Sequence, residues 1–266
     1  MAKKKKKTII LTGGATGIGA ATASRLLSKK CNVIVLDVVE PNEKSIQFIH
    51  CDLGNSDSIS SAAEHIPNNI DALVNVAGVS NALPGEMIMA VNFLGLRQLS
   101  ETLLPRINPG GTIVNVASTA AFDWKTRQTI INEFLDTEDF DSGTSWLQEN
   151  KDIWIDNPYK FSKQCTAAYT YRAVGYAIKS GVRVNCVHPG STGTQLTVEF
   201  RKLVGDALYD WGVGQVGREG EPEDIAEIIE FLSIGECRWL NGVEITADGG
   251  FLAGMVGGWL DLTSKP

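Results

Sequence analysis

Short runs of apolar, mostly β-branched residues alternate along the chain with longer segments in which apolar positions recur at helical spacing. The short runs predict strands at Thr8–Thr12, Val33–Asp37, Gln47–Asp52, Ala72–Val76, Thr112–Ala117, Val182–Val187 and Val243–Thr246. The longer segments predict helices, the clearest at Ala20–Lys30, Ser58–His65, Val91–Ile107, Tyr159–Lys179 and Glu223–Leu232. We therefore expect an α/β fold, a Rossmann-type doubly wound parallel seven-stranded sheet with helices on both faces.

These strands and their crossovers account for the whole length, so we expect a single domain, 1–266. One segment, 122–157, is rich in aspartate, glutamate and tryptophan, and it separates a strand from the helix that should follow closely. A connection this long is usually a functional lid or a structured insertion, and we expect some helix in it. Residues 1–7, with their run of lysines, are interpreted as a basic tail.

Composition narrows the functional class. A formal net charge of −7 leaves no broad basic face, so we expect no nucleic-acid partner and a solvated lysine run. The apolar run after the lysines stops at Gly13, too soon for a secretory signal, and Phe251–Leu260 is shorter than the ~20 residues of a membrane span. The five cysteines are scattered and the three histidines show no ligand spacing. We predict a cytoplasmic protein without disulfides, metal or membrane contact.

A glycine-rich turn, Thr-Gly-Gly-Ala-Thr-Gly-Ile-Gly at 12–19, joins the first predicted strand to the first predicted helix. Glycines let the backbone approach a pyrophosphate, and a helix N-terminus offers it free N–H groups and the positive end of the helix dipole. The turn predicts a dinucleotide site that includes Gly13, Thr16, Gly17, Ile18 and Gly19. The alternative is simply a tight strand-to-helix connection.

Asp37 ends the second predicted strand, eighteen positions after Gly19. A carboxylate at this point of a Rossmann unit accepts hydrogen bonds from the adenosine ribose hydroxyls. It would repel a 2′-phosphate, and Val38 supplies no compensating positive charge, so we predict NAD rather than NADP. The alternative is an aspartate that only caps a turn.

Tyr159 and Lys163 are four positions apart and therefore share one face of a predicted helix, for which Asn157 and Pro158 are typical first residues. To act as a base near neutrality, a tyrosine must lose about three pKa units, worth about 4 kcal/mol. An ammonium ~4 Å away at an effective dielectric of ~20 supplies about that much, and a positive nicotinamide ring would add to it. We predict that Tyr159 transfers a proton. The alternative is an amphipathic helix with a lysine that reaches solvent.

With these residues in view, the chain resembles the short-chain dehydrogenase/reductase family, and the resemblance runs from Thr8 to Phe251. The further positions that match are Asp52 with Leu53, Asn-Val-Ala-Gly at 75–78, Asn92, Ser118, the segment from Pro189 to Thr194, and Asp-Gly-Gly at 248–250. So many matches in order are far more specific than any single motif.

The resemblance implies a role for each matching position. For the cofactor, the implied contacts are Asp52 and Leu53 at the adenine ring, Asn75, Ala77 and Gly78 beneath the adenosine ribose, and Pro189, Thr192 and Thr194 near the nicotinamide and pyrophosphate. For catalysis, the implied residues are Ser118 at the substrate oxygen, Tyr159 as acid/base, Lys163 also at the nicotinamide ribose, and Asn92 on a water-linked proton path. Hydride would move directly between substrate and nicotinamide.

Two departures from the family pattern are informative. Tyr159 follows Ser118 by 41 positions, much more than is common in the family, and the stretch from Gly78 to Asn92 is shortened. This combination resembles the bacterial 3α-hydroxysteroid dehydrogenase/carbonyl reductase subgroup and the related coniferyl-alcohol dehydrogenases. Because the insertion lies beside the helix through which many members form tetramers, we expect a homo-oligomer that is a dimer rather than a tetramer.

The segment Val198–Val216 falls where the family places its substrate lid, and its apolar side chains could cover a hydrophobic alcohol or ketone or pack against their own domain or a partner subunit. The predicted function is therefore an NAD-dependent dehydrogenase or ketone reductase. Enoyl reduction and 3-oxoacyl thioester reduction are disfavoured by the Tyr159–Lys163 spacing and by Asp37, respectively. A non-catalytic NAD-binding module, the alternative from another class, needs no positioned acid/base group.

Overall fold

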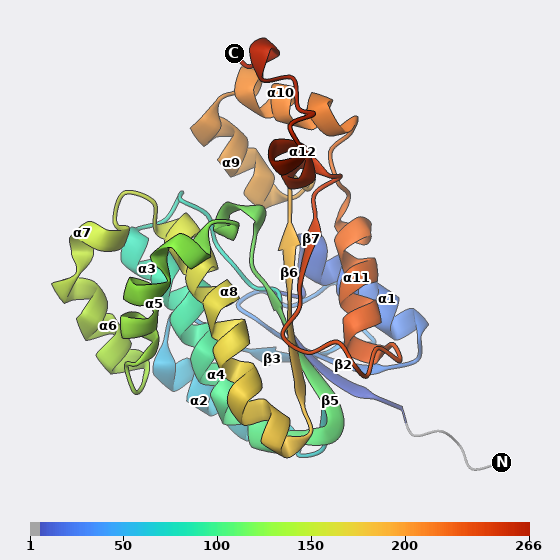
Figure 1. Ribbon diagram of the computed structural model, residues 1–266. Coiled ribbons are helices and arrows are strands. Elements are labelled where there is room, and N and C mark those ends of the chain that lie inside the picture. Colours follow the sequence, from blue (N-terminus) through green and yellow to red (C-terminus); the bar gives the residue numbers. More distant parts are fainter. Residues whose placement is uncertain (1–5) are drawn as a thin grey trace.

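The computed structural model describes residues 6–266, and its centre is one seven-stranded, wholly parallel sheet with the strand order β3-β2-β1-β4-β5-β6-β7. The strands are β1 (Thr8–Thr12), β2 (Asn32–Asp37), β3 (Gln47–His50), β4 (Ile70–Asn75), β5 (Ile107–Val116), β6 (Arg183–Pro189) and β7 (Glu244–Ala247). The order reverses beside β1, so that β1 and β4 carry the switch point at which open α/β sheets bind ligands. The predicted Rossmann-type fold is confirmed (Figure 1).

Helices cover both faces of this sheet. They are α1 (Gly17–Ser28), α2 (Ser56–Glu64), α3 (Gly85–Met89), α4 (Gly95–Leu103), α5 (Gln128–Leu135), α6 (Phe140–Glu149), α7 (Lys151–Trp154), α8 (Pro158–Ala177), α9 (Gln195–Val204), α10 (Asp206–Val216), α11 (Pro222–Ile234) and α12 (Phe251–Gly257). Helices α1 and α11 pack against each other on one face, and α2, α4 and α8 lie on the other.

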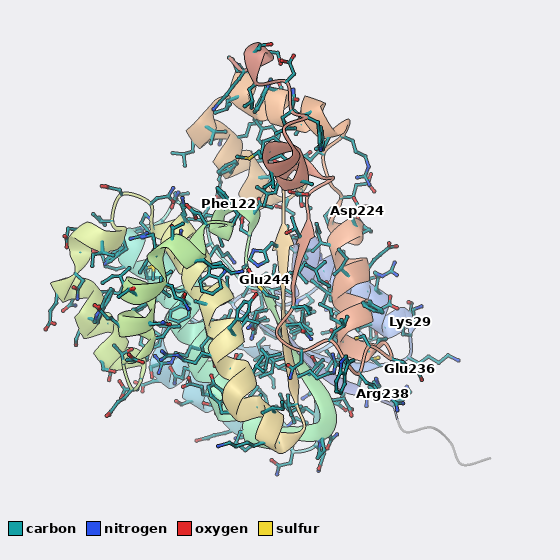
Figure 2. The ribbon with its side chains drawn as sticks, in the orientation of Figure 1. Lys29, Phe122, Asp224, Glu236, Arg238 and Glu244 are labelled. Atoms are coloured by element: carbon teal, nitrogen blue, oxygen red, sulfur yellow. The ribbon has the colours of Figure 1, made fainter. Side chains whose placement is uncertain are left out.

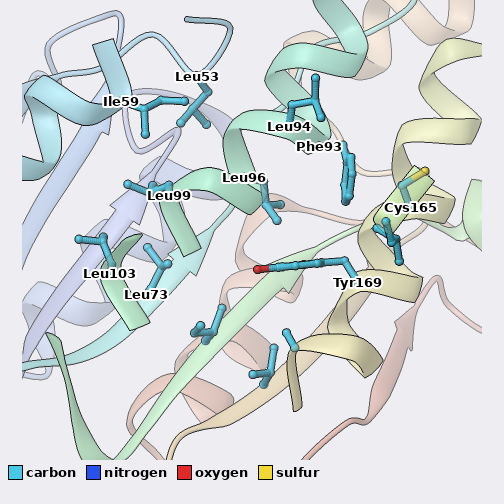
Figure 3. Packing of buried hydrophobic residues seen from close by; sticks show 14 of the residues in the cluster. Leu53, Ile59, Leu73, Phe93, Leu94, Leu96, Leu99, Leu103, Cys165 and Tyr169 are labelled. Carbon is cyan, nitrogen blue, oxygen red and sulfur yellow. The ribbon is translucent and has the colours of Figure 1, made fainter. Parts of the chain in front are cut away.

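Successive strand residues point to opposite faces, and the core divides accordingly. In β1, Ile9 and Leu11 pack with Leu26 of α1 and Ile229 of α11, whereas Ile10 packs on the other face. That second cluster is the larger one, and Figure 3 shows Tyr169 reaching into it from α8 beside Leu96 and Leu99 of α4. The sheet is thus buried on both sides, as its near-continuous apolar strands require.

The region predicted as one helix at Val91–Ile107 is different in the structure. It begins as a π-helical turn, Ala90–Leu94, continues as α4, and ends in a 3-10 turn at Leu104–Arg106. Ile107 already belongs to β5, where it pairs with Ile70 before the register shifts at the Asn-Pro-Gly-Gly sequence. The predicted helix is therefore present as far as Arg106, and its π and 3-10 turns were not predicted because helical periodicity does not distinguish the types of helical turn. The start of β5 was missed because Pro109 and the two glycines are typical of a turn.

The insertion at 122–157 contains α5, α6 and α7, which confirms the helix expected there. It lies beside α8 (Figure 1), and its aromatic rings continue the core outward. The centroids of the Phe134 and Trp146 rings are 4.8 Å apart, and that of Phe161 of α8 is 6.1 Å from Phe134. Buried Arg97 of α4 adds a hydrogen bond of 3.1 Å to the Thr137 hydroxyl. The insertion is therefore part of the packed structure rather than a loose loop.

Three helices, α9, α10 and α12, lie beyond the carboxyl ends of the strands (Figure 1). The last residues of the chain contact this group, because the Trp211 indole N–H of α10 donates to the Ser264 hydroxyl at 3.1 Å. At the other end of the chain, residues 1–5 of the predicted tail lie outside the described residues. Lys7, expected in that tail, instead donates from its amine to the Ile234 carbonyl oxygen at 3.0 Å. Within residues 6–266, none of the helices combines the length and the apolar character that crossing a membrane requires.

Candidate active site

The glycine turn after β1 has no room for side chains. A Cβ on Gly19 would lie 1.8 Å from the Gly13 carbonyl oxygen, and one on Gly13 would lie 2.6 Å from the Ala77 Cα. The Thr12 hydroxyl accepts hydrogen bonds from the N–H groups of Val76 and Ala77, each at 3.1 Å. The turn is thereby held against the loop that follows β4, and its backbone faces the switch point of the sheet.

Helix α1 begins directly at this turn and has no side-chain cap. Thr16 occupies the N-cap position, yet its side chain accepts no hydrogen bond from the helix. Thr194 approaches from the other side, with its Cγ2 3.2 Å from the place of a Cβ on Gly17. An uncapped N-terminus next to bare backbone suits an anion such as a pyrophosphate. Gly13, Gly17, Gly19 and Thr194 therefore fit the phosphates of a dinucleotide.

Asp37 lies at the end of β2, at the edge of this turn. Its two carboxylate oxygens accept backbone N–H groups, Oδ2 from Ala15 at 3.0 Å and Oδ1 from Val39 at 3.1 Å. The side chain is only partly buried, and each carboxylate oxygen can accept a further hydrogen bond. Asp37 thus caps a turn, as the alternative interpretation of this residue predicted. Its carboxylate also keeps acceptors that a ribose could use.

The residues expected around the adenosine divide into two groups. Asp52 is exposed, and its Oδ1 accepts the Gly54 N–H at 2.8 Å. In contrast, the side chains of Leu53 and Asn75 point into the protein (Leu53 in Figure 3). The Asn75 amide nitrogen donates to Ser100 and to Asn115, both at 2.9 Å, so this side chain joins β4 to β5 and α4.

Tyr159 and Lys163 lie in the first turns of α8, and the Asn157 side chain caps this helix by accepting the Lys160 N–H at 3.0 Å. Lys163 is 3% exposed. Its Nζ donates to the Val116 carbonyl oxygen of β5 at 2.9 Å and lies 5.9 Å from the centre of the Tyr159 ring. The strand therefore fixes the amine beside the phenol.

The acidity predicted for the phenol is not present in this arrangement of the chain. Burial raises the pKa of Tyr159, and the Ser118 side chain opposes this effect. Burial also lowers the pKa of Lys163, to about 8. The prediction assumed an ammonium about 4 Å from the hydroxyl, and in the structure Nζ lies 5.9 Å from the centre of the ring and donates to the Val116 carbonyl oxygen. Among the groups of the chain, desolvation is the largest influence on the pKa of Tyr159.

Asn92 lies in the π-helical turn, a conformation often found at functional sites. Its Oδ1 accepts the Val79 N–H at 2.7 Å, and its Nδ2 donates to the Val79 carbonyl oxygen at 3.0 Å. A Cβ on Gly78 would lie 3.3 Å from Asn92 Oδ1 and 3.4 Å from Lys163 Nζ. The loop after β4 thus brings Asn92 and Lys163 to the same place.

Ser118 follows the end of β5 in extended conformation and starts a 3-10 turn, with its hydroxyl accepting the Ala120 N–H at 3.1 Å. Across the sheet, Pro189 ends β6 and Thr192 is buried at 3% exposure, with its hydroxyl donating to the Gly190 carbonyl oxygen. The structure therefore gathers Asn92, Ser118, Tyr159 and Lys163 at the carboxyl ends of the strands.

Sequence reasoning missed several residues that hold this site. Thr12 and Val116 act through the hydroxyl and carbonyl contacts given above; Thr12 begins the predicted glycine-rich turn but received no role there, and no pattern marks the Val116 carbonyl. His188 and Glu244 are paired side chains next to Ser118. A signal for them was present, because Glu244 is a charged residue within the predicted strand Val243–Thr246 and His188 directly follows the predicted strand Val182–Val187.

No group of three or more histidine, cysteine, aspartate or glutamate side chains suitable for a metal ion occurs within the described range 6–266. The polar groups of the site are the Tyr159 phenol, a hydroxyl (Ser118), an amide (Asn92) and an amine (Lys163). Such a set moves protons and orients polar groups, and it leaves the redox step to a bound dinucleotide.

Comparison with known proteins gives matches along most of the chain. A family model described as short chain dehydrogenase matches residues 7–130, and a model described as Enoyl-(Acyl carrier protein) reductase matches residues 144–252. Coniferyl-alcohol dehydrogenase from Pseudomonas sp. (strain HR199 / DSM 7063) is 33% identical over 245 residues, which cover 92% of this chain and 96% of that protein.

Two hydroxysteroid dehydrogenases are also similar. The 3-alpha-hydroxysteroid dehydrogenase/carbonyl reductase of Comamonas testosteroni is 25% identical over 256 residues, covering 93% of this chain and 97% of that protein. The crystal structure of the 3-alpha-hydroxysteroid dehydrogenase from Pseudomonas sp. B-0831, complexed with NADH, superposes with a TM-score of 0.78 at 26% identity. That match covers 95% of this chain and 99% of the other.

Proposed function

The chain belongs to the short-chain dehydrogenase/reductase family of oxidoreductases, and from this premise we propose that it interconverts a hydrophobic secondary alcohol and its ketone with NAD. The observation that carries the proposal is the gathering of Ser118, Tyr159 and Lys163 beside the Gly78 loop. The bound dinucleotide would accept or supply the hydride. A steroid-sized or similar apolar substrate fits the partly exposed apolar side chains of α9, Val198, Phe200 and Leu203.

In alcohol oxidation, the proton of the substrate hydroxyl would move to the Tyr159 phenolate, and the hydride would leave the carbon that carries this hydroxyl for the bound dinucleotide. In ketone reduction, the protonated phenol returns that proton to the carbonyl oxygen. Ser118 donates a hydrogen bond to the substrate oxygen in both directions. Lys163, fixed by Val116, orients the ribose next to the ring and adds positive charge beside the phenol.

The raised pKa of Tyr159 determines the direction in which the reaction rates should change with pH. A phenol with a raised pKa stays protonated at neutral pH, so it is ready as the acid for ketone reduction. Alcohol oxidation needs the phenolate and should become faster as the pH rises above neutrality. Measured kcat/KM for oxidation should therefore increase between about pH 7 and 10, and the increase should be absent in Tyr159→Phe.

The test is turnover by purified protein with NAD⁺ and a panel of alcohols, followed by the reverse reaction with the ketones. Tyr159→Phe should lose activity by about 10²-fold or more while it still binds NADH, measured by fluorescence titration. Tyr176→Phe is the matched control, because it removes a hydroxyl from the same helix away from the site and should keep full activity. Equal turnover in wild type and Tyr159→Phe would refute the role of Tyr159.

A second candidate substrate class is aromatic allylic alcohols. The coniferyl-alcohol dehydrogenase, at 33% identity, favours it over steroids. The panel should therefore pair coniferyl alcohol with a 3α-hydroxysteroid at equal concentration, and the larger kcat/KM decides between them. If NADH binds tightly and neither the panel nor the matching carbonyl compounds turn over, the non-catalytic NAD-binding module becomes the better interpretation.

We also propose that the protein is a cytoplasmic homodimer. Helices α5 and α6 of the insertion pack over α4 and α8, through the stack of Phe134 with Trp146 and through Arg97. The part of α8 from Phe161 to Thr170 is therefore covered within one chain and is not free for a second copy. Light scattering after gel filtration should give the mass of two chains, about 57 kDa from the chain mass of 28.7 kDa, and a four-chain mass would refute the proposal.

A further inference from the structure

A buried histidine and a glutamate contact the backbone of Ser118. His188, in β6, is 3% exposed, and its Nδ1 lies 2.9 Å from the Ser118 carbonyl oxygen. Its Nε2 lies 2.9 Å from Oε2 of Glu244, the first residue of β7. A carbonyl oxygen can only accept hydrogen bonds, so Nδ1 must carry a proton, and the carboxylate 2.9 Å from Nε2 favours a second proton there by its charge. The two contacts together favour an imidazolium.

Two aromatic side chains hold the partner carboxylate. The Tyr171 hydroxyl of α8 donates to Glu244 Oε1 at 2.7 Å, and the Trp124 indole N–H donates to Oε2 at 3.1 Å. Trp124 belongs to the insertion and is 4% exposed. Glu244 thus lies between α8, β6 and the insertion, as Figure 2 shows. Burial by itself would raise the pKa of Glu244, but these donors and His188 outweigh it and lower the pKa to about 2.

The charge on His188 follows from the groups around it. Burial alone would lower its pKa, whereas contacts with Cys186 of the same strand, with Glu244 and with the Ser118 carbonyl raise it to about 10. A further charged group close to the two aromatic rings is Lys125, whose Nζ lies 5.7 Å from the centre of the Trp124 ring and 5.9 Å from that of Tyr171. The imidazolium is therefore stable through the physiological pH range.

We propose that the His188–Glu244 ion pair positions Ser118 for the reaction. The imidazolium donates to the Ser118 carbonyl and fixes the backbone from which the hydroxyl projects, while Trp124 lets the insertion hold the carboxylate. This inference rests on the proposed function of Ser118, and His188 and Glu244 act as positioning residues that touch no reacting atom. A misplacement of a catalytic group by about 1 Å can cost about 10²-fold in rate, so such a support is consequential.

Two substitutions at His188 separate positioning from simple filling of space. His188→Asn places an amide N–H near the position of Nδ1 and keeps the donor to Ser118, whereas His188→Gln places it near Nε2 and keeps only the donor to Glu244. We expect His188→Gln to lower kcat by about 10- to 100-fold with the KM for NAD unchanged, and His188→Asn to stay within about threefold of wild type. Equal kcat in all three proteins, or an equal loss in both variants at equal thermal stability, would overturn the proposal.

A second variant serves if a substitution at His188 prevents folding. Glu244→Gln removes the charge and keeps the shape, so the pKa of His188 should return toward its ordinary value of 6.5. The kcat of this variant should then show an additional step near about pH 6–8 that is absent in wild type. Unchanged pH profiles would contradict the positioning role.

Nitrogen-15 NMR of the histidine rings gives a readout that is independent of turnover. At pH 8, the wild-type ring of His188 should be doubly protonated, and in Glu244→Gln it should be neutral. A neutral wild-type ring overturns the ion pair and with it the inference. A neutral ring in a protein that turns over its substrate overturns the inference alone. A charged ring in a protein that turns over no alcohol or ketone overturns the proposed function, and the positioning of Ser118 fails with it.

Discussion

The glycine turn and the group formed by α9, α10 and α12 lie at the same end of the sheet, yet they are built differently. Helix α1 buries five of its residues, and the turn before it leaves no space for a single Cβ at Gly13 or Gly19. Helix α9 buries none, α10 buries only Tyr209, and α12 buries only Gly254. The region that fits the dinucleotide is thus fixed by backbone packing, while the region that we propose to cover the substrate is held by few buried contacts.

The difference in buried contacts indicates that α9 and α10 can change conformation more easily than α1. Local opening costs least where few apolar groups are buried, so α9 and α10 should open with a smaller free energy than α1. Their contacts to the rest of the chain include polar ones, such as Tyr209 with Glu219 and Ser80 with Glu199. A rigid cofactor region with an adaptable cover allows one chemistry to serve substrates of different shape.

The largest effect should come from filling the glycine turn. Gly19→Ala would place a Cβ 1.8 Å from the Gly13 carbonyl oxygen, and the backbone must move to relieve the clash. We expect NADH binding to be lost and the free energy of unfolding to fall by about 4 kcal/mol or more, measured by urea denaturation.

Gly175→Ala is the matched control for this change. Gly175 lies in the interior of α8, and a Cβ there would meet nothing within 4 Å. The variant should bind NADH normally and gain about 0.5–1 kcal/mol, because alanine favours a helix. A folded Gly19→Ala protein with normal NADH affinity would contradict the rigidity assigned to the turn.

A smaller loss is expected from Thr12→Val. The substitution keeps the shape of a side chain that is 1% exposed, but it removes the acceptor of the Val76 and Ala77 N–H groups. Two poorly solvated donors would lose their partner, at a cost of about 1–3 kcal/mol. Thr246→Val, an exposed position in β7, should change the unfolding free energy by less than about 0.5 kcal/mol. Similar values for the two variants would show that Thr12 does not hold the turn.

The ion pair beneath Ser118 should contribute a pH-dependent term of about 2 kcal/mol. Glu244 has its pKa lowered from 4.5 to about 2, so its contribution is complete above pH 4.5 and is lost as the pH falls through 2. His188 has its pKa raised from 6.5 to about 10, so its contribution is complete below pH 6.5 and is lost as the pH rises through 10. The difference in unfolding free energy between wild type and Glu244→Gln should therefore be largest between pH 4.5 and 6.5.

The smallest effect on stability is expected in the cover, the group formed by α9, α10 and α12. Leu203 in α9 is 62% exposed, so Leu203→Ser should change the unfolding free energy by less than about 0.5 kcal/mol. The same change should raise the KM for an apolar alcohol, and the KM for NAD should stay constant. Hydrogen exchange should show faster exchange in α9 and α10 than in α1, and equal protection would remove the contrast between the two regions.

Much of the fold could be predicted because its signals are local. Runs such as Val33–Asp37 are buried on both faces and carry the β-branched residues that strands favour, and the glycine turn identifies itself by composition. The start of β5 could not be predicted in this way, because Asn-Pro-Gly-Gly is typical of a turn and becomes part of a strand only through its pairing with β4. Tertiary contact decided the outcome there.

The site shows the same division. Tyr159 and Lys163 are one helical turn apart, so spacing alone places them on one face. The position of the Lys163 amine depends on the Val116 carbonyl of a strand 47 positions away in sequence, and the raised pKa of the phenol comes from its burial in the fold. His188 and Glu244 are also distant in sequence and meet only because β6 and β7 are neighbours. Electrostatic arguments from sequence therefore fail where a charged side chain is bound by a group that is distant in sequence.

The contact between Trp211 and Ser264 has a practical consequence for work with this protein. Asp261 strengthens the same junction, since its N–H donates to the Gln215 side chain at 2.9 Å and its carbonyl oxygen accepts the Trp211 indole N–H at 3.3 Å. An affinity tag fused after Pro266 would begin two residues from this junction, and its own motion would act on α10. Kinetic constants from carboxyl-tagged protein should therefore be compared with those from amino-tagged protein before any difference between substrates is assigned to the cover.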